Sequence, residues 1–183
     1  TTIHGVNPAF LIETILRERI LDSLYYKDQC FGLTAATILD RIVELTYVGG
    51  SYGASRPTEF ICLVLKLLQL LPEREIVLAY LQDTSFKYLR ILAAFYVRLT
   101  FPAKLVYETL EPLLLDKRKI RVRNAAGGWR IEHVDEIVDR LLTEARVFDV
   151  ALPNLMARTL LEDLDELEPR VSPLQAELEA SDE

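Results

Sequence analysis

The side chains best suited to chemistry are two histidines and two cysteines: His4, His133, Cys30 and Cys62. Neither cysteine has a histidine nearby in the sequence, and Cys62 lies in an apolar stretch, where a thiol is buried and inert. The HExxH and dinucleotide-binding motifs are absent. We therefore expect no enzyme, no cofactor and no small-molecule substrate. A Cys–His pair assembled by folding is the most distant alternative.

Metal binding requires several ligands that converge on one point. The densest group of candidate ligands is His133, Asp135, Glu136 and Asp139. On the helix predicted there, His133 and Glu136 share one face while Asp135 and Asp139 share another, so the four side chains diverge. We expect an ordinary solvated helix start and no metal. The two cysteines, 32 positions apart without a CxxC pair, favour a reducing, intracellular compartment.

The segment GGSYGASRP, Gly49 to Pro57, has the highest glycine density in the chain. A phosphate-binding loop of the G-x-x-x-x-G-K-[ST] type follows a strand and carries a lysine. This segment follows a predicted helix and has no lysine, so we interpret it as a tight structural crossing whose glycines adopt positive φ. Tyr52 and Arg56 are expected to be exposed there as interface anchors.

A cationic cluster follows between positions 117 and 130, and Trp129 lies within it. Alternating residues predict a strand, a turn and a strand over 119–133, with Ile120 and Val122 on the same face as Trp129 and Ile131. RNA contact is one interpretation, because phosphate neutralisation needs clustered cations. The other is a solvated hairpin face, which the expected burial of Trp129 favours. The candidate RNA-binding residues are Lys117, Arg118, Lys119, Arg121, Arg123 and Arg130.

The element that must position these residues is the stretch Ser85 to Thr100, which is apolar on nearly every side. An apolar stripe of that width cannot face one neighbour, so the helix must be covered from several directions. With 16 residues and three cations it is too short and too charged to span a membrane, which takes roughly 20 apolar residues. Ala93 and Ala94 allow close approach by a second apolar helix, Thr58 to Leu71.

Helix signals occur along most of the remaining chain. Asn7 and Pro8 predict the start of a helix that runs to about Tyr25, with Leu11, Ile15 and residues 21–25 on its buried side.

Thr34 is the expected cap of a second helix, which Gly49 and Gly50 end. Thr58 caps the third helix, and Pro112 kinks or ends a later one. The predicted fold is all-α: a compact domain of about seven to nine helices with one small β-hairpin near residues 119–133.

Length and charge set the domain boundaries. A chain of 183 residues, half of them apolar, suffices for one domain, which we place at 1–167. The net charge is −7, but residues 162–183 hold nine acidic residues and one basic residue, so the remainder is close to neutral. Residues 168–183 are expected to form an acidic, proline-containing tail, extended or partly disordered. A nearly neutral globule is not a general nucleic-acid binder by bulk charge.

Seven blocks of sequence, in order, resemble the conserved domain of the pre-mRNA-splicing factor 38 family. They are CFGLTA (30–35), VGGSYG (48–53), PTEFICLVLKLLQLLPEREIV (57–77), FKYLRILAAFYVRLT (86–100), YETLEPLLLDKRKIR (107–121), HVDEIVDRLL (133–142) and LPNLMAR (152–158). The resemblance implies a nuclear, all-helical, non-enzymatic protein of the spliceosome that joins the tri-snRNP and is needed at activation. It also implies partners, among them a zinc-finger splicing protein and a charged, helical splicing factor.

One position departs from the family pattern: members usually have Asp-Tyr-Arg-Lys where this chain has Asp116 to Lys119. The chain therefore lacks the aromatic side chain that a stacking contact there would use. The leading hypothesis is an interaction scaffold that binds segments of splicing proteins in grooves between helices. The alternative is a direct RNA-binding module for snRNA or pre-mRNA that uses the hairpin cations. The candidate partner-binding residues are Tyr52, Arg56, Lys66, Lys87, Tyr88 and Arg90.

Overall fold

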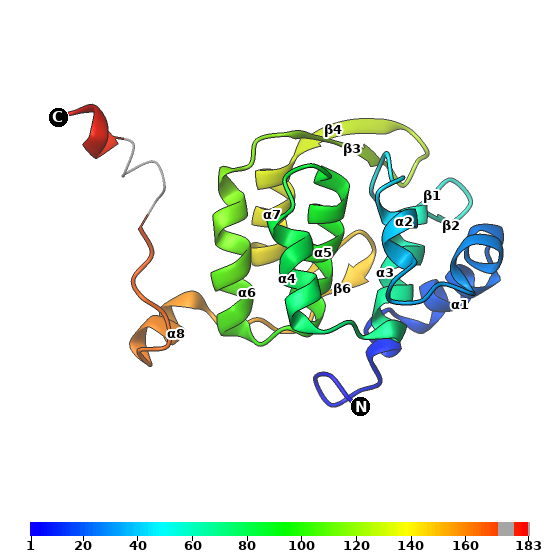
Figure 1. The fold of residues 1–183 in the computed structure, drawn as a ribbon, viewed down its shortest axis with the longest axis horizontal. Helices are drawn as coiled ribbons and strands as arrows, with labels where there is room; N and C mark the ends of the chain where they lie inside the picture. The colour runs from blue at the N-terminus through cyan, green and yellow to red at the C-terminus, as the bar shows by residue number, and fades with distance from the viewer. Residues whose placement is uncertain (172–177, 183) are drawn as a thin grey trace.

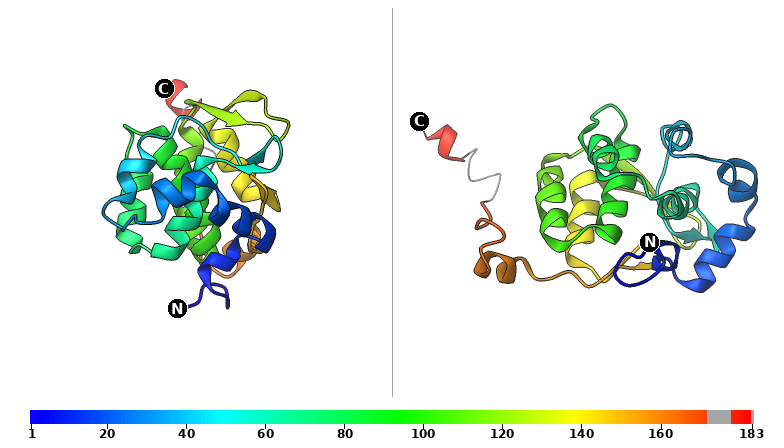
Figure 2. Two further views of the ribbon diagram at one scale, coloured as in Figure 1. Left: turned by 90° about the vertical axis from the view of Figure 1, so that its right-hand side faces the viewer. Right: turned by 60° about the horizontal axis from the view of Figure 1, so that its bottom comes forward.

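The computed structural model describes residues 1–171 and 178–182. Four helices, α4 to α7, lie side by side, and the chain before α4 forms a second group of helices beside them (Figure 1). The right-hand view of Figure 2 shows the same division. The helices are α1 (Thr14–Asp22), α2 (Ile38–Ile42), α3 (Glu59–Leu70), α4 (Arg74–Gln82), α5 (Lys87–Thr100), α6 (Ala103–Leu110), α7 (Val134–Thr143) and α8 (Arg158–Asp163).

Short segments join these helices. Two 3₁₀-helices cover Pro8–Leu11 and Glu111–Leu115, and a π-helix covers Tyr26–Cys30. The strands form three antiparallel pairs, and the mostly helical class is confirmed. The predicted hairpin is present, and two shorter pairs that the sequence did not indicate accompany it. The strands are β1 (Ser51–Tyr52), β2 (Arg56–Pro57), β3 (Lys119–Arg123), β4 (Trp129–His133), β5 (Arg146–Val147) and β6 (Val150–Ala151).

Helix α5 is the centre of the core, as its composition predicts. Every side chain from Ile91 to Leu99 is buried, Arg98 included. The predicted packing against α3 is also present, since the rings of Phe60 and Phe95 meet edge to face with 5.8 Å between their centroids. Within the part of the chain that the structure describes, no helix is long and apolar enough to cross a membrane.

The prediction for the first helix is wrong in two respects: the length of the helix and the set of side chains on its buried side. Asn7 does cap a helical turn, because its side chain accepts a hydrogen bond from the Ala9 N–H, but this 3₁₀-helix ends at Leu11. Ile12 and Glu13 are extended, with ψ of 127° and 149°, and α1 starts afresh after them. The break rotates the buried side, so that Ile12, Leu16 and Ile20 are buried while Ile15 is 66% exposed.

The second predicted helix is also shorter than expected. The Thr34 hydroxyl accepts from the Thr37 N–H in a turn, and α2 then covers only Ile38–Ile42. It ends well before Gly49, and Val48 bonds to β3 instead of continuing a helix: its N–H donates to the Arg121 carbonyl, and its own carbonyl accepts from the Arg123 N–H. By contrast, the Thr58 cap is confirmed, since its hydroxyl accepts from the Ile61 N–H.

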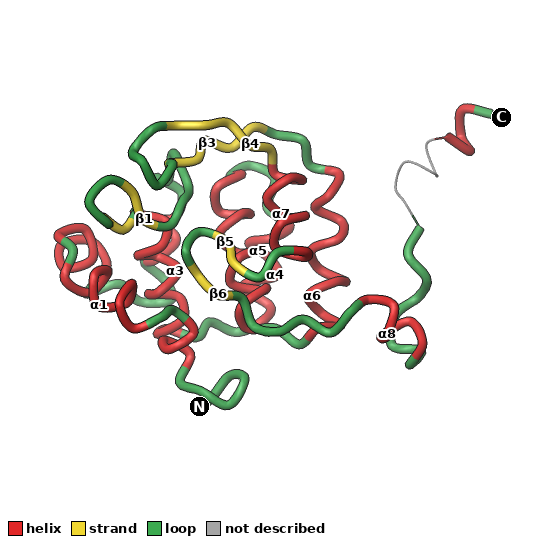
Figure 3. Tube along the Cα trace, turned by 180° about the vertical axis from the view of Figure 1, so that it is seen from behind, coloured by secondary structure: helices red, strands yellow, loops and turns green. Residues whose placement is uncertain are grey.

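The predicted tight crossing at Gly49 to Pro57 agrees with the contacts. Gly49 has φ of 151°, and a Cβ added to Gly50 would collide with the Phe148 carbonyl. Phe148 belongs to a two-residue turn between β5 and β6, where both Phe148 (φ 51°) and Asp149 (φ 64°) are left-handed. Figure 3 shows this short hairpin lying against α5, on the side away from the viewer of Figure 1. This hairpin could not be predicted from the sequence, because two-residue turns of this kind usually contain Asn and Gly rather than Phe and Asp.

Candidate binding surface

The register of the β3–β4 hairpin decides which side chains are available to a ligand. Arg123 lies opposite Trp129 and Arg121 opposite Ile131, whereas Val122 lies opposite Arg130. Residues directly opposite each other share a face of the sheet, so Trp129 and Ile131 lie with the arginines. The prediction that they share the buried face of Ile120 and Val122 is therefore wrong. The cause is the five-residue connection 124–128, which fixes a pairing one position away from the expected one.

Trp129 is 40% exposed, and the guanidinium groups of two arginines lie against its indole ring. The guanidinium carbon of Arg121 is 3.8 Å from the centroid of the indole, and that of Arg123 is 4.2 Å away. Tyr47 meets the indole edge-on with 5.1 Å between centroids, and Arg123 also lies 4.6 Å from the ring of Tyr52. We call this surface the hairpin face; it consists of Tyr47, Tyr52, Lys119, Arg121, Arg123 and Trp129.

Three of the six candidate RNA-binding cations are paired with acids. Lys117 lies 2.8 Å from an Asp135 oxygen, Arg118 lies 2.7 Å from an Asp116 oxygen, and Arg130 lies 3.5 Å from a Glu132 oxygen. The other three have no carboxylate at ion-pair distance within residues 1–171 and 178–182, and all three belong to the hairpin face. They are Lys119, Arg121 and Arg123.

Four of the six candidate partner-binding residues lie at the surface near β3. Tyr52 contacts Arg123, and Arg56 pairs with Tyr52 across β1 and β2. The Tyr88 hydroxyl accepts a hydrogen bond from the Arg121 N–H, and the Lys87 ammonium lies 5.6 Å from the Tyr88 ring. The structure therefore brings part of the two predicted sets together along one strand, which the sequence did not indicate.

The other two candidate partner-binding residues, Lys66 and Arg90, are largely internal. Lys66 is buried in α3 and donates to the carbonyl of Phe31. The Arg90 side chain is 12% exposed and donates to the carbonyl of Leu81 and to Asp116. Since these donors are already used within the domain, Lys66 and Arg90 hold α3 and α5 to their neighbours.

Asp116 anchors the start of the hairpin. Burial alone would raise the pKa of its carboxyl group, but hydrogen bonds from Arg118 and Arg90 outweigh burial and hold the pKa at about 2. Asp116 also accepts from the backbone N–H of Arg118, and its own carbonyl accepts from the Asp135 N–H. Asp116 therefore joins α5 and the residue before β3 through its carboxylate, and α7 through its backbone carbonyl.

Neither cysteine lies in surroundings that activate a thiol. Burial raises the pKa of both Cys30 and Cys62 to about 12, the opposite of what activates a thiolate. His133 lies with its Nδ1 2.5 Å from an oxygen of Glu136, as their shared helix face predicts. In the described segments, no three His, Cys, Asp or Glu residues are grouped so as to hold a metal ion.

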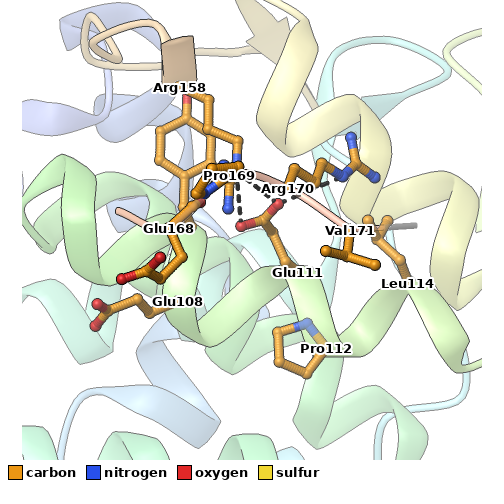
Figure 4. Close-up of a pocket in the computed structure, with 10 residues that line it drawn as sticks. Glu108, Glu111, Pro112, Leu114, Arg158, Glu168, Pro169, Arg170 and Val171 are labelled. Atoms are coloured by element: carbon orange, nitrogen blue, oxygen red, sulfur yellow. Dashed lines mark hydrogen bonds and ion pairs between the residues drawn. The ribbon is translucent and has the colours of Figure 1, made fainter. Parts of the chain in front are cut away.

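A pocket that the sequence did not indicate lies where the chain beyond α8 returns to α6. Glu111 points toward both Arg158 and Arg170 there, as Figure 4 shows. The Arg158 guanidinium also pairs with Glu162 and donates to the carbonyl of Glu168. These contacts hold residues 168–171, the start of the predicted tail, against the domain. The rest of the tail prediction falls partly on residues 172–177 and 183, outside the described residues.

Fold and surface together define a mostly helical domain that presents a cationic, aromatic hairpin to its surroundings. A family model described as the PRP38 family matches residues 1–165. The chain belongs to this family, and the resemblance drawn from the seven sequence blocks is confirmed.

Named relatives agree over most of the chain. Pre-mRNA-splicing factor 38 of Schizosaccharomyces pombe is 57% identical over 91% of this chain and 79% of its own length. The protein of the same name from Drosophila melanogaster is 49% identical over 97% of this chain and 54% of its own length. Pre-mRNA-splicing factor 38A of Homo sapiens is 48% identical, and the chain spans 57% of it.

A solved structure shares the fold. One chain in the crystal structure of the Snu23-Prp38-MFAP1(217-258) complex of Chaetomium thermophilum superposes with a TM-score of 0.88 at 47% sequence identity. The match covers 97% of both chains. The likeness therefore extends over nearly the whole length of both chains.

Proposed function

We propose that this chain is a non-enzymatic interaction domain of the spliceosome that binds segments of other splicing proteins in the nucleus. The observation that carries the proposal is the likeness, over 97% of both chains, to a chain solved in complex with splicing proteins. The partners proposed by analogy are a zinc-finger splicing protein, a charged helical splicing factor and components of the tri-snRNP. We further propose that the chain is required when the assembled spliceosome is activated.

The surface supports such a role in two places. Large apolar side chains are exposed along the N-terminal helices, among them Phe10 (59%), Ile15 (66%), Leu24 (73%) and Phe31 (76%). Exposed apolar side chains of this size become buried when a surface associates with a partner. The second place is the group around β3 that contains Tyr52, Arg56, Lys87 and Tyr88, where aromatic and cationic side chains serve as anchors.

Binding can be tested with the two proteins that form the fungal complex. The chain, a Snu23 homologue and the matching MFAP1 segment would be mixed and analysed by size-exclusion chromatography and calorimetry. A ternary complex is expected. If neither protein binds the folded chain at about 10 μM, where a biological interface is saturated, the proposal is wrong.

The N-terminal surface can be tested in the same assay by pairs of exposed substitutions. Leu24→Ser with Phe31→Ser is expected to weaken at least one of the two interactions by about tenfold, since each side chain removed leaves apolar contacts unmade. The control is Leu160→Ser with Leu164→Ser, a pair on or beside α8 that is 46% and 57% exposed. Equal effects of the two pairs would remove the N-terminal surface from the proposal.

The activation stage requires a functional assay. Depleting the homologous protein from a splicing extract is expected to let spliceosomes assemble and then stop before activation, and adding back this chain tests whether the domain suffices. Arrest before assembly would contradict the proposed stage.

Direct RNA contact is a second candidate function, and the outward position of Trp129 favours it. The expected burial of Trp129 was the argument for a merely solvated hairpin, and the register removes that argument. A salt titration separates the two functions: RNA affinity carried by phosphate contacts falls steeply with salt, whereas apolar protein contacts respond weakly.

A further inference from the structure

We propose that the hairpin face is a clamp for the phosphodiester backbone of single-stranded RNA, in which Trp129 holds Arg121 and Arg123 in place for phosphate oxygens. This inference rests on the second candidate function and specifies it. It assigns phosphate contact to three cations of the hairpin rather than to all six. It also makes Trp129 a positioning residue rather than a platform for a base.

The geometry orders both guanidinium groups before any ligand arrives. Arg121 and Arg123 contact the same indole, at 3.8 Å and 4.2 Å from its centroid. A cation held over an aromatic face is attracted by the ring quadrupole and loses the freedom of a long side chain. Stacking uses the face of the guanidinium and leaves its in-plane N–H groups to form the paired bonds that suit phosphate.

The charge of these arginines is not compensated within the domain. No described carboxylate pairs with Arg121 or Arg123, although Asp116, Glu132 and Asp135 pair with other hairpin cations nearby. The Nε of Arg123 is buried and has no hydrogen-bond acceptor among the described residues. A cation partly removed from water without a counter-charge gains more from an anion than a fully solvated one does.

The location of the cations favours RNA over an acidic peptide. Lys119, Arg121 and Arg123 lie on β3, which is flanked by Val48 on one side and by β4 on the other. An added peptide strand would pair with the free edge of β4 and meet Trp129 and Ile131 instead. A nucleic-acid backbone can cross the face of the sheet, where the three cations recur about every 6.7 Å.

Aromatic rings beside the cations complete the chemistry expected for single-stranded RNA. Tyr47 and Tyr52 are half-buried and border the two arginines. Cationic grooves with interleaved aromatic rings are the usual sites for single strands. The indole itself is already contacted by two guanidinium groups and by Tyr47. For that reason its role is to hold the arginines, and any base would stack on the tyrosines.

Trp129 is also the sole tryptophan of the chain, which makes the test direct. Its fluorescence would be followed while an oligouridylate of about twelve nucleotides is added at several salt concentrations between about 0.05 and 0.3 M. The wild-type chain is expected to show a fluorescence change on binding. Its affinity should fall with salt at a logarithmic slope of about −2, since three phosphates on a single strand give about −0.7 each.

Two charge-matched double variants identify the cations, with binding measured by anisotropy of a labelled oligouridylate. Arg121→Gln with Arg123→Gln is expected to lower the affinity at least about tenfold and to reduce the salt slope to about −0.7. Lys117→Gln with Arg130→Gln removes the same charge from paired positions and should lower the affinity less than about threefold. If both double variants lose the same affinity, the clamp proposal is wrong, although the chain would still bind RNA.

The role of Trp129 is tested by one aliphatic replacement and one aromatic replacement. Trp129→Leu keeps an apolar side chain but removes the ring, and it should lower the affinity nearly as much as loss of the two arginines. Trp129→Phe keeps a ring and should recover most of the binding, with thermal unfolding confirming that both variants fold. If Leu and Phe behave alike, Trp129 does not hold the arginines.

In the last experiment, a polyglutamate peptide with the same charge as the oligouridylate is used as a competitor. Competition by this peptide as strong as by the oligouridylate would assign the face to acidic peptides and overturn the proposal. No binding of the oligouridylate by the folded wild-type chain would overturn both the clamp and the second candidate function. The protein-scaffold proposal would be untouched, because its own assay uses Snu23 and MFAP1 segments.

Discussion

The rings of Phe148 and Phe60 meet edge to face, with 5.6 Å between their centroids. Phe148 comes from the turn between β5 and β6, whereas Phe60 lies in the first turn of α3, 88 positions earlier in the chain. Phe148 also lies 5.9 Å from Phe95 of α5 and is only 7% exposed. A turn residue thus fills the space between the two most buried helices.

Replacing this turn residue should destabilise the whole domain. Phe148→Ala is expected to lower the free energy of unfolding by about 3–5 kcal/mol, the usual cost of deleting a buried aromatic ring. Urea denaturation followed by circular dichroism measures it. Phe31→Ala is the control, since that ring is 76% exposed and should change the stability by less than about 0.5 kcal/mol. Equal effects would mean that the ring contacts contribute little.

The turn itself depends on Asp149. This carboxylate accepts hydrogen bonds from both the N–H and the hydroxyl of Ser51, each 2.7 Å long, while its backbone has a φ of 64°. Asn tolerates a left-handed backbone and keeps an acceptor, whereas Ala does neither.

Asp149→Asn is therefore expected to cost less than about 1 kcal/mol and Asp149→Ala about 2 kcal/mol or more. The difference between their thermal unfolding midpoints checks this. A similar loss for both would point to the charge of Asp149 rather than to its hydrogen bonds and backbone.

Asp116 predicts a loss of stability in acid. Its pKa is about 2 in the folded domain and about 3.8 when unperturbed, so the unfolded chain binds a proton first as the pH falls. The contribution of Asp116 is complete above pH 4 and disappears as the pH falls through 2, amounting to about 2 kcal/mol. Asp116→Asn should be less stable at neutral pH and show a flatter profile between pH 4 and 2. An unchanged profile would exclude Asp116 as a source of acid sensitivity.

The pocket at α6 makes a prediction about the start of the tail. Glu111 pairs with Arg158 and Arg170, and the side chains of Glu111 and Arg158 are each 19% exposed. Glu111→Gln weakens both pairs, so trypsin should cleave after Arg170 several-fold faster than in the wild type. Glu73→Gln, remote from this pocket, is the control. Cleavage at an unchanged rate would show that these pairs do not hold residues 168–171.

The features that could be predicted from the sequence are those set by local signals, such as helix caps and prolines, or by a helix that is apolar on every side. Thr58 caps α3 through a bond to a residue three positions away, and Pro112 stops α6 at Leu110. Helix α5 is apolar all round, so its central burial follows from composition alone. In each case the deciding interaction lies within one helix or one stretch of chain.

The features that could not be predicted depend on partners far away in the sequence. Val48 follows α2 and bonds with β3, more than 70 positions later. Trp129 faces outward because of a one-position difference in register, which alternation of residue types cannot resolve. Glu13 lies 2.6 Å from Arg146 of β5, a long-range contact that no local pattern encodes.

The insertion of Phe148 also has a consequence for synthesis on the ribosome. Helices α3 and α5 leave the exit tunnel well before residue 148, at about 5–20 residues per second, so for some seconds their aromatic side chains lack the ring that completes their packing. A nascent chain at that stage exposes apolar surface of the kind that chaperones bind. The last third of the polypeptide thus determines when the helices of the middle third become protected from aggregation.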